Sequence, residues 1–318
     1  MSDPEYPSYA QLCQFVREAE RYPRLSDPIP AHRYAGWALP MIMDGHRLLD
    51  VPDRWGYHLR ILKDQRLPDE PIPQIQFLSG PHPETLKHLH QWIRLAAHHQ
   101  STWTGMTDLI DWMAYALCVS PKPPRLEDAI QADLYQQVNF LELVLHPYDY
   151  FGDIICEGIG DGKWANPGAF FPTPMDVCRL MAQMILPDLT NASRETLLKF
   201  RTAKIADNAG SGTGRMLLLG SNVSLSIFGI ERDLLVRTAS LINGALYAPW
   251  ITFPIPTHIL AQAPFCAETL VDDEPESAVA MPAPSSMASI TCLMPPPISP
   301  MIGEESEPPS QQLVFPGW

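Results

Sequence analysis

The sequence predicts an α/β protein, with a helical domain in front of the sheet and a tail without a core behind it. Three observations lead to this prediction. A glycine-rich loop joins a short apolar strand to a helix in IADNAGSGTGRMLLLGSN (205–222). Amphipathic helical segments precede residue 146, and residues 271–318 contain ten prolines. We therefore expect a helical domain over 1–145, an α/β domain over 146–270 and a tail over 271–318.

The helical domain is predicted from the spacing of its apolar residues. Apolar side chains recur every three or four positions in three segments: 84–99, 106–119 and 128–145. Proline-rich breaks flank or separate the helices: 23–30, 68–83 and 119–124. In the same region we expect Trp92, Trp103 and Trp112 to pack in the core or at an interface rather than to stack on bases.

Composition limits the class of protein. The chain has 318 residues, 46% of them hydrophobic, which is enough for a sizeable core. Its formal charge is −14, whereas proteins that hold nucleic acid through phosphates show a basic face. Residues 271–318 contain seven acidic residues and no Lys or Arg. Such a segment cannot offset the entropy of ordering, so we expect a disordered, solubilising tail, with nucleic-acid mimicry or partner recruitment as alternatives.

Other features exclude several kinds of site and location. Six widely spaced cysteines without a CxxC pair argue against a zinc site or a disulfide framework. The acidic N-terminus lacks a signal-peptide pattern, and no apolar run reaches the ~18 residues of a membrane span, so we expect a cytoplasmic protein without a membrane partner. The histidine cluster invites a metal site, but no carboxylate or cysteine completes a ligand set, so we expect a solvated face instead. The cluster comprises His88, His90, His98 and His99.

The glycine-rich loop has the order strand, loop, helix. A strand around 204–207 ends at Asp207, and a helix begins after the loop. Gly210, Gly212 and Gly214 let the backbone approach a ligand closely, and the helix N-terminus offers free N–H groups. This arrangement predicts a nucleoside-type ligand, although such loops also serve as plain turns.

A second strand is expected after the loop and ends in a carboxylate. LSIFGIE (225–231) places Glu231 17 residues after Gly214. A carboxylate at this strand end can accept hydrogen bonds from ribose hydroxyls. The segment 233–246 supplies the crossover helix. The lack of GxxxxGK[ST] disfavours an ordinary ATP site, and a dinucleotide and S-adenosylmethionine fit the loop about equally well.

The segment GAFFPTPMDVCRLMAQMI (168–185) predicts a capped helix in front of the loop. Thr173 is expected to be its N-cap, with Pro174 at the first helical position. The stripe that we expect to be buried comprises Val177, Met181 and Met184 or Ile185.

Four motifs of this region stand in a defined order: Phe151-Gly152-Asp153, FFPTP (170–174), DNAGSGTGRMLL (207–218) and GIERD (229–233). In this order, and over about 100 residues, the chain resembles the N6-adenine DNA methyltransferases. These include the modification subunits of type I restriction systems and stand-alone relatives on phages and mobile elements. The resemblance implies a Rossmann-like methyltransferase sheet, S-adenosylmethionine as the cofactor and double-stranded DNA as the partner.

The resemblance also implies roles for particular residues. The residues that match the segment closing over the cofactor are Phe171, Thr173 and Pro174. Those that match the loop around its methionine part are Asp207, Gly210, Gly212 and Gly214, and Glu231 matches the ribose-binding carboxylate. FFPTP has one residue more than the family's FFTP. DNAGSGTG does not align cleanly with DPACGTG, so either Asp207 stands one residue early or Asn208 takes the acidic position.

The family's catalytic motif, [DNS]PP[YFW], has no convincing match. Its oxygens accept the amine hydrogens of the flipped adenine and its aromatic ring stacks on that base. After Glu231, PP pairs occur only in 294–299 and 307–310, neither followed by an aromatic residue. YAPW (247–250) and HPYDY (146–150) place an aromatic residue after a proline but lack the remaining residues.

The sheet is also expected to be incomplete. About 40 residues separate the second strand from the tail, and THILAQAPFCAETL (257–270) is the candidate third strand. Two interpretations follow. The chain is an adenine-N6 methyltransferase or supplies only the cofactor site, with a second subunit carrying the catalytic motif. Alternatively, it is a catalytically inactive methylase-fold protein with a binding or accessory role.

Overall fold

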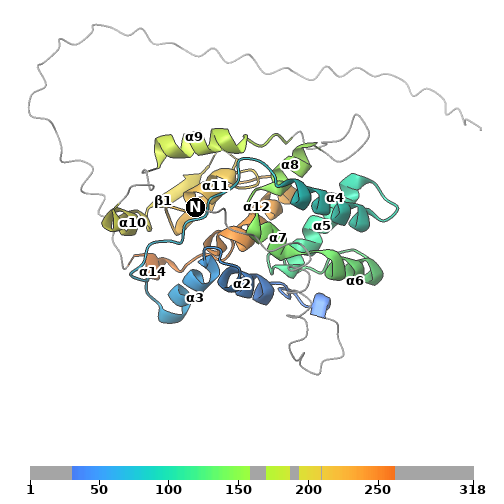
Figure 1. Cartoon of the computed structure of the whole chain (residues 1–318), viewed down its shortest axis with the longest axis horizontal. Helices are drawn as coiled ribbons and strands as arrows, with labels where there is room; N and C mark the ends of the chain where they lie inside the picture. The colour runs from blue at the N-terminus through green and yellow to red at the C-terminus, as the bar shows by residue number, and fades with distance from the viewer. Residues whose placement is uncertain (1–30, 158–169, 187–192, 209, 262–318) are drawn as a thin grey trace, which may run out of the picture. The chain divides into compact units, whose positions relative to one another are not determined.

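The computed structural model describes residues 31–157, 170–186, 193–208 and 210–261 (Figure 1). In these ranges the chain is mostly helical and contains one small parallel sheet of two strands. The larger Rossmann-like sheet remains a prediction. The expected tail and most of the 257–270 segment lie outside the described residues.

The first region consists of helices joined by irregular segments. In chain order they are η1 (Ala31–Arg33), α2 (Leu39–Leu48), α3 (Arg54–Asp64), α4 (Pro83–Ala97), α5 (Thr102–Ala116), α6 (Asp128–Gln137) and α7 (Phe140–Leu145). The helices expected over 84–99 and 106–119 are confirmed as α4 and α5. The segment 128–145 forms two helices instead of one, because Asn139 has an extended backbone and its side chain accepts a hydrogen bond from the Leu141 N–H at 3.2 Å.

The second region carries the sheet. Its helices are α8 (Tyr150–Glu157), α9 (Met175–Ile185), α10 (Arg194–Phe200), α11 (Arg215–Gly220), α12 (Leu234–Tyr247), α13 (Pro249–Thr252) and α14 (Thr257–Leu260). Strand β1 (Lys204–Asp207) pairs in parallel with β2 (Ser226–Gly229), and Asp207 lies opposite Gly229. The predicted order of strand, loop, helix, strand and helix is therefore confirmed.

The predicted third strand is wrong for the residues that the structure describes. Thr257–Leu260 forms the short helix α14, with Pro256 as its N-cap. Proline fixes its own backbone angle and suits the start of a helix, so the apolar pair Ile259 and Leu260 belongs to a helical turn rather than to a strand.

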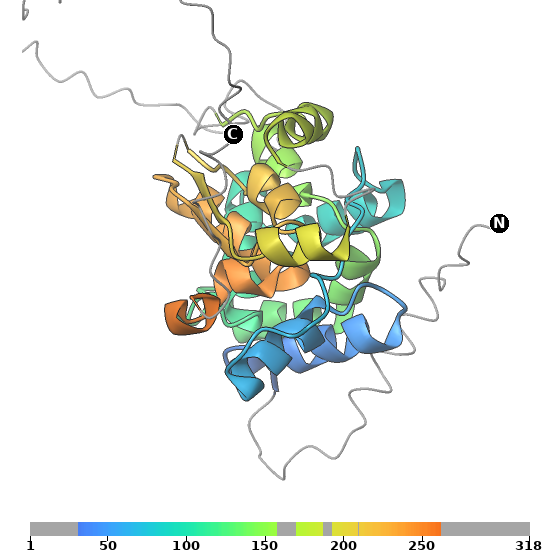
Figure 2. The ribbon, with the colours of Figure 1, turned by 90° about the vertical axis from the view of Figure 1, so that its left-hand side faces the viewer.

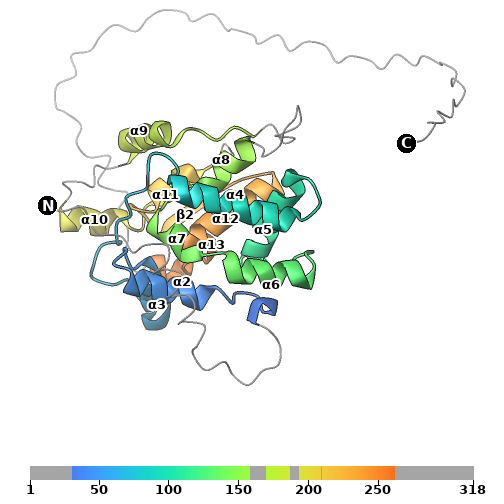
Figure 3. The ribbon, with the colours of Figure 1, turned by 45° about the vertical axis from the view of Figure 1, so that its right-hand side comes forward.

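One apolar cluster includes buried residues from both regions, among them Leu109, Phe140, Ile154, Leu218 and Leu246. Helix α12 contacts α5, α8 and α11, and Figures 1 and 3 show it running among these helices. Trp92 and Trp112 are buried in this cluster, which confirms their place in the core. A boundary at residues 145 and 146 stays a prediction.

A second apolar cluster joins α3, which precedes the strands in the sequence, to α13 and α14, which follow them. Tyr57 and Ile61 of α3 pack with Trp250 of α13 and Ile259 of α14. Among the described residues, none of the helices combines the length and the apolar character needed to cross a bilayer.

Candidate functional site

The glycine loop turns between β1 and α11 with a backbone that favours glycine. Gly210, Gly212 and Gly214 have φ angles of 103°, 56° and 90°. Residues with a Cβ atom rarely adopt such positive φ angles without strain. Gly214 is the N-cap of α11, and a Cβ atom there would lie 2.6 Å from Ser240 Oγ. The loop therefore has its shape because these three positions lack side chains.

Glu231, two residues after the end of β2, lies against this loop. Its Oε2 accepts a hydrogen bond from the Gly212 N–H at 2.9 Å. Its Oε1 accepts from the N–H groups of Arg232 and Asp233 at 2.7 and 2.9 Å. The Ile230 N–H also donates to the Asp207 carbonyl at 3.0 Å. The structure thus brings the carboxylate and the ends of both strands to one side of the loop.

The FFPTP segment reaches the same loop. The Phe170 ring lies 3.3 Å from the position that a Cβ on Gly212 would take. The Thr173 carbonyl accepts a hydrogen bond from Arg215, the first residue of α11, at 2.9 Å. Phe171, by contrast, is 76% exposed, and Thr173 and Pro174 are exposed as well. The backbone of this segment is fixed to the loop while these side chains face solvent.

Two expectations for the following helix are wrong. Thr173 does not cap α9, because the helix begins at Met175. The N-cap is Pro174, which has a non-helical backbone (ψ 143°) and makes no side-chain hydrogen bond. The stripe expected to be buried is instead exposed: Val177, Met181, Met184 and Ile185. The buried residues of α9 are Met175, Cys178 and Ala182, on the face that packs on α11.

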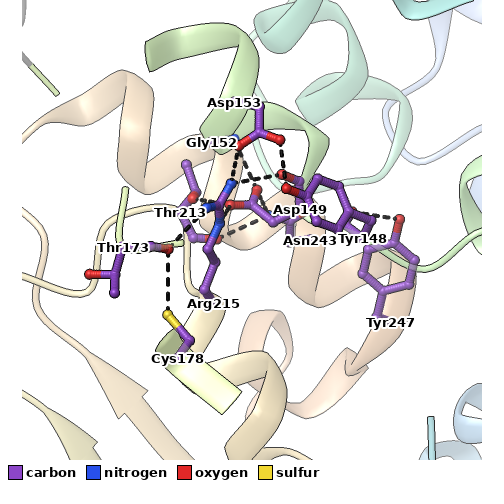
Figure 4. Close-up of polar contacts among 10 residues, drawn as sticks. All are labelled: Tyr148, Asp149, Gly152, Asp153, Thr173, Cys178, Thr213, Arg215, Asn243 and Tyr247. Carbon is purple, nitrogen blue, oxygen red and sulfur yellow. Dashed lines mark hydrogen bonds and ion pairs between the residues drawn. The ribbon is translucent and has the colours of Figure 1, made fainter. Parts of the chain in front are cut away.

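Arg215 joins the segments, and sequence reasoning missed it. Its guanidinium donates to Asp149 Oδ2 at 2.8 Å and to Asp153 Oδ1 at 2.5 Å, in addition to the Thr173 carbonyl (Figure 4). Asp149 is fully buried and Arg215 is 5% exposed. The only hint in the sequence is the spacing of the two aspartates, which places both on one side of a helical turn.

Asp149 is held by four donors. Besides Arg215, it accepts from the Thr213 hydroxyl, from the Gly152 N–H at 3.0 Å and from Asn243 Nδ2 at 2.8 Å. A Cβ on Gly152 would lie 2.8 Å from both Arg215 and Thr213, so glycine is the residue that fits there. A charged group buried so deeply is stable only when it is paired and hydrogen-bonded, and this one is both.

The electrostatics of the cluster favour a permanent charge on Arg215. Burial on its own lowers the pKa of Arg215, but the carboxylates of Asp149 and Asp153 outweigh that effect and raise the pKa above its ordinary value. Burial, together with a hydrogen bond donated to Asp153 at 2.6 Å, raises the pKa of the Tyr148 hydroxyl. Arg215 therefore keeps its charge and Tyr148 keeps its proton near neutral pH, which suits a positioning role for both.

Neither Pro-aromatic pair offers a free ring for a flipped base. In YAPW, Tyr247 and Trp250 are buried, and their polar atoms donate to backbone carbonyls, Trp250 Nε1 to Ser224 at 3.1 Å. In HPYDY, Tyr148 is buried and binds Asp153. The PP pairs at 294–299 and 307–310 lie outside the described residues.

The histidine cluster is only partly the solvated face that the sequence predicts. His98 and His99 are exposed, but His88 is half-buried and its Nδ1 lies 2.8 Å from Oε1 of the buried Glu142. In the part of the chain that the structure describes, no group of three or more histidine, cysteine or acidic side chains is arranged to hold a metal ion.

A cavity of about 710 Å³ lies elsewhere in the structure, beside the extended segment 74–79. None of the predicted site residues lines it. His82 and His146 do, with stacked rings whose centroids are 3.8 Å apart, and burial, followed by the neighbouring His82, lowers the pKa of His146 to about 4. No Lys or Arg lines the cavity, so it does not suit a phosphate group.

Comparison with known proteins finds no matching family model, no matching curated protein and no matching solved structure. What the chain does must therefore be inferred from its own residues and their geometry.

Proposed function

We propose that this chain binds S-adenosylmethionine at the glycine loop and supplies the cofactor site of an adenine-N6 DNA methyltransferase. The observation that carries the proposal is the convergence on Arg215. Three segments separated by tens of residues meet there: the helix start at 149–153, the FFPTP segment and the glycine loop. These are the segments whose order in the sequence resembles the methyltransferase family.

The loop residues fit a nucleoside-type cofactor. Among the described residues, the nearest neighbour of a Cβ on Gly210 would be Glu231 Oε2, at 3.9 Å, so none of their side chains fills the space in front of this glycine. Gly210 is exposed, and Gly212 and Glu231 are partly exposed. A backbone without side chains lets a ligand approach the loop closely, which is the purpose of glycine in nucleotide-binding loops. The N–H groups of Ser211, Gly212 and Gly214 already donate within the protein, so the loop contacts the ligand here by close packing.

Each group has a definite task in this proposal. Glu231 already accepts three N–H hydrogen bonds, and its remaining acceptor position takes one ribose hydroxyl. The loop from Asp207 to Gly214 surrounds the methionine part. Phe171, Thr173 and Pro174, all exposed beside the loop, close over the ligand. S-adenosylmethionine supplies an electrophilic methyl group when bound, while Arg215 keeps the loop and the FFPTP segment in register.

The chemistry of methyl transfer requires a further element. The adenine amine needs oxygen acceptors for its hydrogens and a ring to stack on. Within residues 31–157, 170–186, 193–208 and 210–261, the aromatic rings of both Pro-aromatic pairs are buried. We therefore favour a role in which a second subunit carries the catalytic motif. A catalytically inactive accessory protein that keeps only the cofactor pocket is the alternative.

A thermal-shift titration of the full chain with S-adenosylmethionine and S-adenosylhomocysteine tests cofactor binding. A ligand present at 100 times its dissociation constant stabilises a protein by about 2.7 kcal/mol, which is readily measured. We expect the ligand to raise the melting temperature of the wild type and of the control variant Glu127→Ala, which removes an exposed carboxylate next to α6. We expect no such rise for Gly212→Asp. No shift for the wild type would overturn the proposal.

A gel-shift assay tests the DNA part separately. Phosphate contacts are strongest at low salt, so low salt is the most sensitive condition for detecting a complex with a chain of net charge −14. Absence of a complex with double-stranded DNA at low salt, in the presence of S-adenosylmethionine, would remove DNA as a direct partner and leave the cofactor site untouched.

A further inference from the structure

The segment 74–78, between α3 and α4, has the side-chain pattern of a β-strand, although no described strand pairs with it. Ile75 and Phe77 are buried, whereas Gln74 and Gln76 are exposed. Alternation with a period of two residues is typical of an extended backbone. Figure 1 shows the segment as part of the long link between α3 and α4, and Figure 2 shows the same link from the side.

One edge of this segment is occupied by side chains from elsewhere in the chain. Asn222 binds both backbone groups of Ile75: Oδ1 accepts from the N–H and Nδ2 donates to the carbonyl, both at 2.9 Å. The carbonyls two residues before and two residues after Ile75 each accept from a guanidinium: Pro73 from Arg54 at 2.7 Å and Phe77 from Arg179 at 2.9 Å. These contacts hold the segment extended, in the way that a neighbouring strand would.

The opposite edge of the segment is open. In an extended chain, the N–H and C=O groups of one residue lie on the side opposite to those of its two neighbours. The backbone groups of Gln74 and Gln76 therefore face away from Asn222, and none of them has a hydrogen-bond partner among the described residues. The Leu78 N–H lies on the same edge and donates to the Pro147 carbonyl at 2.9 Å. The open edge therefore faces the chain around residue 147.

The cavity of about 710 Å³ lies between these two parts of the chain. Residues 74–79 line it on one side and residues 144–147 on the other. Its apolar lining includes Val51, Phe77, Val144 and Leu145. Its volume is within the range of about 300–1,000 Å³ that is common for ligand sites. The cavity and the open edge together offer apolar contacts and backbone hydrogen bonds to the same ligand.

We propose that this cavity is a docking groove for an extended apolar peptide segment of a partner protein, which pairs with the backbone of Gln74 and Gln76 as an added β-strand. In this mode of recognition, main-chain hydrogen bonds provide affinity and alternate side chains fill pockets. Gln74 and Gln76 together offer two N–H and two C=O groups, and a strand of about three residues spans them. An apolar small molecule would fill the cavity but leave these four groups without partners, which favours a peptide.

The charges around the cavity predict the composition of the partner segment. Among the described residues, no Lys or Arg lines the cavity, whereas the carboxylate of Asp50 does. An acidic side chain would find no counter-charge there and would be repelled by a chain of net charge −14. We therefore expect apolar residues at alternate positions, with neutral or basic residues between them. This inference does not depend on the proposed cofactor site, whose residues do not line the cavity.

Fluorescence polarisation with the full chain tests the pairing, with the fluorescein-labelled peptide KVTVIVK as the probe. The control peptide has the same sequence but carries N-methyl groups on the backbone nitrogens of its three central residues. We expect it to bind at least about tenfold more weakly, because it cannot donate to the carbonyls of Gln74 and Gln76. The acidic peptide EVTVIVE should be weaker by a similar factor. Equal affinity of the N-methylated peptide would show that an apolar ligand fills the cavity without strand pairing, which overturns the proposal.

A pair of variants at one position tests the same edge from the side of the protein. Gln76→Pro removes an N–H that has no partner among the described residues, and the extended backbone of Ile75 suits a position before proline. We expect this variant to bind KVTVIVK at least about tenfold more weakly, whereas Gln76→Ala, which keeps the N–H, should bind like the wild type.

The N-methylated peptide, which is tested on the wild type, covers the case in which Gln76→Pro does not fold. Equal binding by folded Gln76→Pro and Gln76→Ala overturns the proposal. So does a lack of KVTVIVK binding by the wild type at protein concentrations up to about 1 mM, where even a complex worth only about 4 kcal/mol is half formed.

Discussion

Arg215 connects segments that are distant in the sequence. It binds Thr173 and Asp149, which lie 42 and 66 positions before it. Its pair with Asp149 is almost completely removed from solvent. Such pairs are not necessarily more stabilising than apolar residues of the same volume, but removing one partner leaves a buried charge alone. Arg215 therefore acts on the site by holding the loop and the FFPTP segment in place.

Arg215→Met should lower the free energy of unfolding by about 3–5 kcal/mol, since it strands Asp149 without a counter-charge. Arg215→Lys should recover little, because an ammonium group cannot reach Asp149, Asp153 and Thr173 with the fixed fork of a guanidinium. Urea denaturation measures both. The control is Arg47→Met, whose pair with Asp44 is exposed and should contribute almost nothing. Equal stability of Arg215→Met and Arg47→Met would contradict this role.

His58 predicts how stability depends on pH. It is 1% exposed, lies beside Trp55 and Trp250, and neither ring nitrogen has a partner among the described residues. Burial lowers the pKa of His58 from 6.5 to about 4. Between these two values the unfolded chain binds more protons than the folded one, so stability is complete above pH 6.5 and falls as the pH falls toward 4.

Substituting His58→Phe should remove this contribution, roughly 2–3 kcal/mol between pH 7 and pH 4. His146, whose pKa is also about 4, keeps its own share, so the difference between wild type and variant isolates His58. Urea denaturation at a series of pH values measures the slopes. His99→Phe, at an exposed position, serves as the control and should leave the slope unchanged. Parallel curves for His58→Phe and wild type would show that burial does not govern this histidine.

At the scale of elements, the loop and its flanking strands depend on glycine geometry. Gly214 combines a φ of 90° with a Cβ position only 2.6 Å from Ser240 Oγ. Gly214→Ala should therefore destabilise the protein by about 1–3 kcal/mol through backbone strain and a contact with α12. Gly80→Ala is the matched control, because a Cβ there meets nothing within 4 Å.

Chemical denaturation of the two alanine variants compares the positions directly. Ser240→Ala in the Gly214→Ala background should return part of the loss by removing the hydroxyl. If Gly214→Ala proved as stable as Gly80→Ala, the loop would not have the left-handed backbone that the account requires.

The sequence predicted which elements form better than it predicted which side of each helix is buried. The order of strand, glycine loop, helix and strand is visible because loop glycines and apolar runs are local signals. The spacing in 175–185 predicted a helix but not which side faces α11, because α9 is apolar on two sides. The pairing of Asp149 with Arg215 joins residues 66 positions apart, and no local pattern announces such a contact. YAPW resembles part of the [DNS]PP[YFW] motif in the sequence, but in the structure Trp250 is packed in an apolar cluster.

At the scale of the whole molecule, the two expected folded regions are connected by buried polar contacts as well as by the shared core. Arg54 of α3 is fully buried, and its hydrogen-bond acceptors among the described residues are carbonyl and hydroxyl oxygens rather than carboxylates. Its guanidinium donates to the Pro73 carbonyl at 2.7 Å and to Ser221 Oγ, just after α11, at 2.6 Å. Burial lowers the pKa of Arg54 to about 9. The helical region is thereby tied to the sheet region.

This connection predicts one cooperative unfolding transition for the folded part of the chain. Far-UV circular dichroism, which reports helices of both regions, and tryptophan fluorescence should give coincident urea transitions. Arg54→Met should shift both curves together, because it leaves carbonyl and hydroxyl groups at the junction unpaired. Two separated transitions would instead show that the regions before and after residue 146 unfold as independent domains.

The most direct test of the central claim is isothermal titration calorimetry of the full chain with S-adenosylmethionine. We predict binding with one site per chain, abolished by Gly212→Asp, weakened by Glu231→Ala and retained in Glu127→Ala. Loss in both loop variants with retention in the control would locate the cofactor between the glycine loop and the end of β2. No binding heat for the wild type at several temperatures, or equal binding by Gly212→Asp, would contradict the proposed cofactor site.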